Sequence, residues 1–73
     1  MGKRNPGLFD LVAVVTPPAD AGVEIGDVGT VVELLPPDAV EVEFIDRDGH
    51  TRALSTLQIT DLLVLNRERT QVA

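Results

Sequence analysis

Three side chains that could take part in chemistry lie at every second position near residue 50: Asp46, Asp48 and His50. Ser55 follows five residues after His50. Aspartate and histidine ligate metals, and Ser, His and Asp together form a hydrolytic triad. A triad also needs a nucleophile turn and an oxyanion hole, and the chain has no Gly-x-Ser-x-Gly motif. A metal site would need a further imidazole or a thiolate, yet His50 is the only histidine and cysteine is absent. We therefore expect no catalytic residue, metal or cofactor here.

Two other patterns resemble ligand motifs without completing them. Asp46 to Gly49 resembles the start of a calcium loop, but the twelfth position, which should hold a bidentate Glu, is Leu57. Gly26 and Gly29 are followed by Thr30 rather than by the lysine of a phosphate loop. The first pattern therefore predicts a hairpin turn. The second, with Asp27, predicts a structural corner that leads into a β-branched strand.

Carboxylates gather on one predicted strand. Val40, Val42 and Phe44 alternate with Glu41 and Glu43, which predicts a strand with one buried and one wet face. Paired glutamates catalyse acid–base chemistry only when they are close to a substrate, and these are expected to be solvated. We instead predict a protein-docking surface that includes these two glutamates. It also includes Ile45, which is apolar but out of phase with the buried residues of the strand, and two further acids. The members of the predicted surface are Glu33, Glu41, Glu43, Ile45 and Asp46.

The charge of the chain is divided unevenly along its length. The 73 residues carry a net charge of −6, but residues 8–65 hold eleven carboxylates against two arginines, a net −9. Such a body repels phosphate backbones and favours a cationic partner, although high charge also serves solubility alone. The lack of cysteine is typical of a reducing cytoplasm, and we expect no signal peptide or membrane span.

Turn signals divide the rest of the chain into short strands. Two prolines at 17 and 18 exclude a helix, Pro36 and Pro37 end a strand, and Asp48-Gly49 signals a hairpin. A 3₁₀ turn is expected at 57–59. Strands are predicted at Leu8–Val15, Val28–Leu35, Val40–Phe44, Thr51–Thr56 and Leu62–Leu65.

These elements predict one all-β domain, a small five-stranded SH3-like barrel with a short 3₁₀ turn before the last strand. An OB-fold is the alternative, although it would need more residues and a helix between its third and fourth strands. The domain is expected to span residues 8–65, between a disordered N-terminal tail at 1–7 and a frayed C-terminal tail at 66–73.

Four stretches of this body resemble one family, the bacterial domain-of-unknown-function family 4926. They are Leu8 to Val12, Gly26 to Glu33, Val40 to Phe44, and Leu54 to Leu57 with Asp61 to Leu63. The resemblance covers roughly residues 8–65 and implies no activity or catalytic residue. The glycine corner is also similar to that of other SH3-like barrels, including accessory subunits of photosynthetic complexes, the nitrile hydratase β-subunit and KOW-type modules.

The absent chemistry and the acidic body predict a non-enzymatic protein-interaction module, an accessory subunit or adaptor that docks on a larger or basic protein. One alternative is an antitoxin or immunity-type protein, since a small acidic protein can cover the basic active site of a toxic enzyme. A KOW-like nucleic-acid-binding barrel is a weaker alternative. The chain lacks Trp and Tyr for base stacking and is acidic. No small-molecule substrate is implied.

Overall fold

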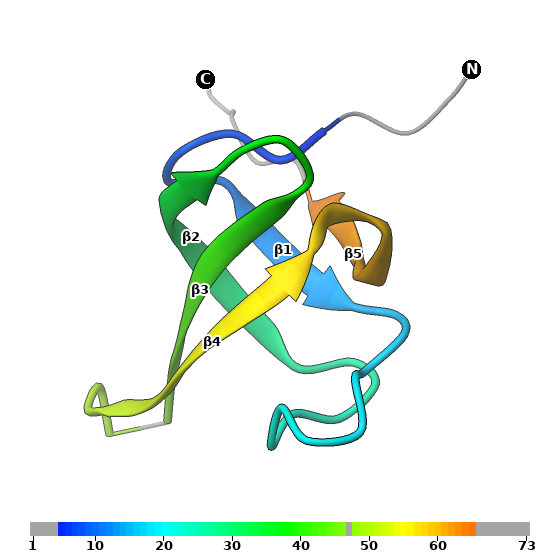
Figure 1. The fold of residues 1–73 in the computed structure, drawn as a ribbon. Coiled ribbons are helices and arrows are strands. Elements are labelled where there is room, and N and C mark those ends of the chain that lie inside the picture. Colours follow the sequence, from blue (N-terminus) through cyan, green and yellow to red (C-terminus); the bar gives the residue numbers. More distant parts are fainter. Residues whose placement is uncertain (1–4, 47, 66–73) are drawn as a thin grey trace.

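The computed structural model describes residues 5–46 and 48–65, which form a single five-stranded antiparallel sheet (Figure 1). The strand order is β4-β3-β2-β1-β5, so consecutive strands pair from β1 to β4 and β5 returns to pair with β1. The elements are β1 (Leu11–Val14), β2 (Val28–Leu35), β3 (Ala39–Ile45), β4 (Thr51–Gln58), the 3₁₀ turn η1 (Ile59–Asp61) and β5 (Leu62–Leu65).

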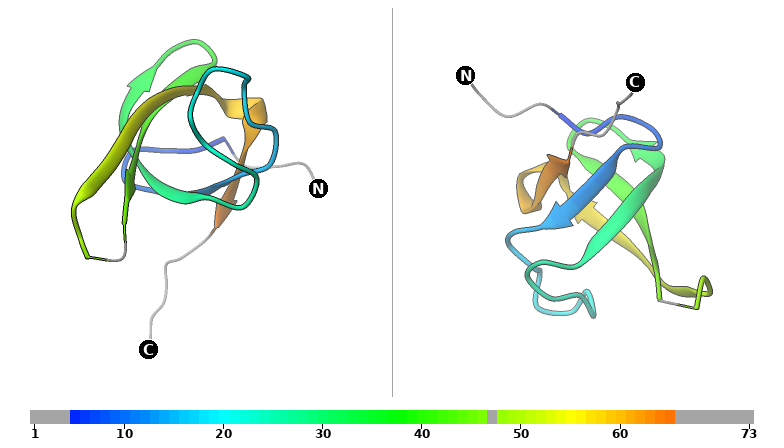
Figure 2. Two further views of the ribbon diagram at one scale, coloured as in Figure 1. Left: turned by 90° about the horizontal axis from the view of Figure 1, so that it is seen from below. Right: turned by 180° about the vertical axis from the view of Figure 1, so that it is seen from behind.

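The sheet curls on itself (Figure 2), and its buried side chains form a small apolar core. On β3, Val40, Val42 and Phe44 are buried while Glu41 and Glu43 are half-buried on the other face, as the alternation predicts. A strand presents successive side chains to opposite faces, so alternate residues of β1 and β3 point into the core, whereas β2 and β5 supply one core residue each. The remaining members of the core are Val12, Val14, Val23, Val31, Leu57 and Leu62.

The predicted all-β fold, with five strands and a 3₁₀ turn before the last strand, is confirmed. Strands β2 and β5 have the predicted bounds. The connection from β3 to β4 is a short hairpin turn rather than the helix that an OB-fold requires. The narrower assignment to SH3-like barrels stays a prediction.

Several predicted boundaries are wrong. Strand β1 ends at Val14 rather than Val15, β3 extends one residue further at each end, and β4 ends at Gln58 rather than Thr56. The first strand begins at Leu11 rather than Leu8, because residues 7–10 form a turn in which Phe9 has a φ of 68°. The 3₁₀ turn lies at Ile59–Asp61 rather than 57–59, because Leu57 is a core residue of β4. The Asp61 carboxylate accepts the Gln58 N–H at 3.2 Å and so fixes the start of this turn.

The loop between β1 and β2 is fastened to the sheet at both ends. Gly26, whose φ is 92°, donates its N–H to the Val14 carbonyl at 2.8 Å, and Val14 donates to the Asp27 carbonyl at 2.9 Å. The buried Ser55 hydroxyl donates to the Ala21 carbonyl at 3.2 Å. Position 26 favours glycine because L-residues with a Cβ rarely adopt such a φ.

Gly29 is needed for a different reason, namely the close approach of β2 and β3. A Cβ at this position would lie 2.7 Å from the Glu43 carbonyl oxygen and 2.9 Å from the Phe44 ring. These distances are shorter than van der Waals contact allows, so glycine permits the sheet to curl at this point.

Residues 1–4, 47 and 66–73 lie outside the described part of the chain. The predicted N-terminal tail at 1–7 therefore falls partly outside it, and the predicted C-terminal tail at 66–73 falls wholly outside it. Of the N-terminal tail, Pro6 is buried and the Gly7 N–H donates to Asp10 Oδ2 at 2.7 Å. Within residues 5–46 and 48–65, no helix has the length and apolar character needed to cross a membrane.

Candidate functional site

The outer surface of β2, β3 and β4 brings three of the predicted docking residues together. Glu33 lies opposite Glu41 across β2 and β3, and Glu43 follows two residues later on the same face of β3. On the other side of β3, Glu41 and Glu43 lie opposite Thr56 and Leu54 of β4. We call this surface the acidic face; its members are Thr30, Glu33, Glu41, Glu43, Leu54 and Thr56.

Threonines of β4 hold two of these glutamates in place. Thr56 donates its hydroxyl to Glu41 Oε1 at 2.7 Å, and Thr51 donates to Glu43 Oε2 at 2.6 Å. Each hydrogen bond engages one oxygen, and a carboxylate has room for several donors on its two oxygens. The glutamates are therefore oriented along the sheet while they keep capacity to accept from a cation.

The pairing of Glu33 with Glu41 is unfavourable for the isolated fold. Like charges directly opposite each other across two strands are destabilising. Arg52, the only Lys or Arg among the described residues, is paired with Asp27 at 3.2 Å and lies 5.6 Å from the centre of the Phe44 ring. The described part of the chain thus holds no Lys or Arg paired with the acidic face.

Apolar side chains lie beside these carboxylates. Leu54 is 58% exposed, opposite Glu43, and Ile45 at the end of β3 is 49% exposed. Leu34 of β2 is also exposed, whereas Val31 is fully buried. Leu63 is exposed as well, but it lies on β5, which pairs with β1 away from these carboxylates. Ile45, which is out of phase with the buried residues of β3, therefore points outward. An acidic surface with exposed leucine and isoleucine is suited to a protein partner.

The sequence did not reveal the exposure of Phe9. The ring was expected inside a buried strand, but its side chain is 71% exposed at a turn formed by residues 7–10, which we call the Phe9 turn. Phe9 donates its N–H to the Val31 carbonyl at 2.7 Å, so the turn lies against β2, as Figures 1 and 2 show. Gly7 and Asp10, both common in turns, were the signal in the sequence.

The Asp46, Asp48 and His50 side chains do approach one another. Their potential ligand atoms all lie within 4.8 Å, and all three residues are exposed. The hairpin turn explains this proximity, because Asp46 Oδ1 accepts the backbone N–H groups of Asp48 at 2.9 Å and of His50 at 3.1 Å. Asp46, a predicted docking residue, thus closes the turn. Ser55 is bonded to the Ala21 carbonyl and does not complete a triad.

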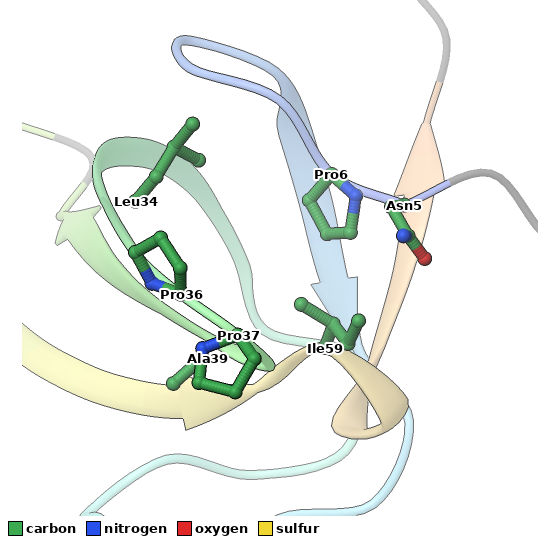
Figure 3. A pocket seen from close by; sticks show the side chains of 7 residues that line it. All are labelled: Asn5, Pro6, Leu34, Pro36, Pro37, Ala39 and Ile59. Carbon is green, nitrogen blue, oxygen red and sulfur yellow. The ribbon is translucent and has the colours of Figure 1, made fainter.

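A small hollow of about 140 Å³ lies between the N-terminal segment and the β2–β3 turn (Figure 3). Ligand sites usually enclose about 300–1,000 Å³. The side chains around it carry no acid, base or nucleophile; they are Asn5, Pro6, Leu34, Pro36, Pro37, Ala39 and Ile59. This hollow is therefore smaller than a typical ligand site and is lined mainly by apolar side chains.

Comparison with known proteins adds a family and no relative of known activity. No curated protein and no solved structure matches the chain. One family profile, described as a domain of unknown function, matches residues 8–64, which include all five strands except the final residue of β5. The chain therefore belongs to the DUF4926 family.

Proposed function

We propose that this domain is a non-enzymatic protein-interaction module that docks through its acidic face on a basic surface of a larger protein. The observation that carries the proposal is the cross-strand pairing of Glu33 with Glu41, with no lysine or arginine of the described chain beside them. A lysine or arginine from a partner would relieve this repulsion. Exposed Leu54 and Ile45 add apolar contact area.

The charge of the body supports the same partner chemistry. Residues 8–65 carry a net charge of −9, which raises the rate at which a basic protein finds this surface and opposes nucleic acids and anionic membranes. The proposal places the domain in the cytoplasm as an accessory subunit or adaptor. Binding should weaken as salt screens the charges.

The test is affinity capture of the tagged chain from its native lysate at low salt, read by mass spectrometry. The informative variant is Glu41→Lys/Glu43→Lys. The matched control is Asp20→Lys/Glu24→Lys, which makes the same change in net charge on two exposed residues of the loop between β1 and β2. We expect a stoichiometric partner that the first variant loses and the control retains.

Two results would contradict the proposal. Equal loss in both variants would mean that total charge, rather than the acidic face, attracts the protein. Retention by both variants would remove this face from the interface. The identity of a retained partner would separate an accessory subunit from an antitoxin.

A further inference from the structure

The Phe9 turn combines an exposed aromatic side chain with a strained backbone conformation. The first is a large aromatic side chain that is 71% exposed, although the chain has only one other aromatic residue, the buried Phe44. The second is a positive φ of 68° at a residue with a bulky side chain. An L-residue is strained in this left-handed region, which turns usually fill with glycine or asparagine.

Hydrogen bonds hold the strained residue in place. The Asp10 N–H donates to the Gly7 carbonyl at 3.1 Å, and the Gly7 N–H returns a bond to the Asp10 carboxylate at 2.7 Å. Phe9 donates to Val31, whose own N–H donates to the Asp10 carbonyl at 3.0 Å. The turn is therefore fixed by its neighbours and presents the ring on a rigid base. Strain that the surrounding structure maintains is a reason to look for function.

The position of the turn connects it with the acidic face. The bond between Phe9 and Val31 places the turn beside β2, two residues before Glu33. Leu11 continues from the turn on the outer face of β1 and lies opposite Thr30, which in turn lies opposite Glu43. An exposed aromatic residue thus stands at the border of a surface rich in carboxylates.

We propose that Phe9 is the apolar anchor of the docking interface, and that its ring enters an apolar pocket on the partner whose rim carries lysine or arginine. This inference rests on the proposed function. Energetically dominant interface residues are typically aromatic and are surrounded by contacts that exclude water. The basic rim follows from charge complementarity with Glu33, Glu41 and Glu43.

The same charges disfavour two other occupants of this surface. A second copy of the chain would bring another net charge of −6 against the acidic face. An anionic membrane would likewise repel the negatively charged domain as Phe9 approached the lipid. Binding to a second copy or to a membrane would therefore contradict the proposal.

The test compares Phe9 with Ile25, an equally exposed apolar residue (74%) in the loop between β1 and β2. A benzophenone amino acid replaces each residue in turn, and the chain is photo-crosslinked in its native lysate. We expect position 9 to crosslink to one protein, within an apolar segment flanked by Lys or Arg, and position 25 not to. Crosslinks that are absent at position 9, shared by both positions or made to a segment without basic residues would overturn the inference.

Binding to that purified partner then gives the size of the effect. Phe9→Asn keeps the turn, because asparagine tolerates positive φ, and should weaken binding about 30-fold or more. Ile25→Asn should change binding by less than about 3-fold. If Glu41→Lys/Glu43→Lys abolishes binding while Phe9→Asn does not, the anchor is wrong and the docking face stands; if neither matters, both proposals fail.

Two controls address the alternative occupants. Sedimentation of the purified chain should show a monomer, and vesicles of phosphatidylcholine with phosphatidylglycerol should not retain it. A dimer or a vesicle-bound form that Phe9→Asn abolishes would assign the ring to self-association or to lipid, and would overturn the inference.

Discussion

The Phe9 turn and the hairpin turn at Asp46–Gly49 are both closed by a backbone hydrogen bond, but different residue types have the positive φ. In each, a backbone N–H donates to a carbonyl three residues earlier, at 3.1 Å to Gly7 and 3.0 Å to Asp46. The Asp10 carboxylate accepts one further N–H group in the first turn, and the Asp46 carboxylate accepts two in the second. The hairpin has Gly49 at φ 87°, whereas the other turn has Phe9 at φ 68°.

This difference separates a turn that serves the fold from one that also presents a side chain. Glycine adopts positive φ without a steric penalty, whereas an L-residue with a Cβ loses about 1–2 kcal/mol. A fold under selection for stability alone would have glycine or asparagine in both turns. The presence of Phe9 is consistent with a role outside the fold.

The other aromatic residue gives the largest contrast with Phe9. Phe44 is 1% exposed and packs in the core. Phe44→Ala should lower the free energy of unfolding by about 3–5 kcal/mol, as large-to-small substitutions of buried aromatics do. A domain of this size has only about 3–5 kcal/mol in total, so far-ultraviolet circular dichroism should show an unfolded chain. A cooperative folded Phe44→Ala variant would contradict the assignment of the core.

Gly29→Ala tests whether close packing requires glycine in β2. The added methyl group would collide with the Glu43 carbonyl and the Phe44 ring, and should lower the free energy of unfolding by about 1–3 kcal/mol. Urea denaturation measures this loss. A variant as stable as the wild type would mean that β2 and β3 separate at this point at no energetic penalty.

Gly49→Ala sharpens the comparison of the two turns directly. No atom lies within 4 Å of the added Cβ, so the effect should come from backbone strain alone and amount to about 1 kcal/mol of lost stability. The thermal midpoint should fall by several degrees. An unchanged midpoint would show that a side chain at positive φ carries no penalty in the hairpin turn, which would contradict the energetic contrast drawn between Gly49 and Phe9.

The fold could be predicted from the sequence where the signals were local. Alternation of valine with glutamate defined β3, and β-branched residues between Gly29 and Pro36 defined β2. The start of β1 could not be predicted, because Leu8 and Phe9 continue an apolar run. Gly7 and Asp10 were the only local signals of the turn, which is defined by the hydrogen bond from the Asp10 N–H to the Gly7 carbonyl and by the positive φ of Phe9.

The candidate site was predictable in composition but not in arrangement. The acids of β3 follow from strand periodicity, since every second residue shares a face. The opposition of Glu33 to Glu41 depends on a register shift between Val31 and Glu33, which no local pattern encodes. The threonine partners of Glu41 and Glu43 likewise depend on the β3–β4 register.

The most direct test of the account is the free energy of unfolding of Phe9→Asn, measured by urea denaturation beside the wild type. Relief of strain should favour the variant by about 1 kcal/mol, and loss of the small buried part of the ring should offset about half of this or more. We expect stability to stay level or to rise slightly. A loss above about 1.5 kcal/mol, as in a core substitution, would show that Phe9 serves the fold and would contradict its role as a docking residue.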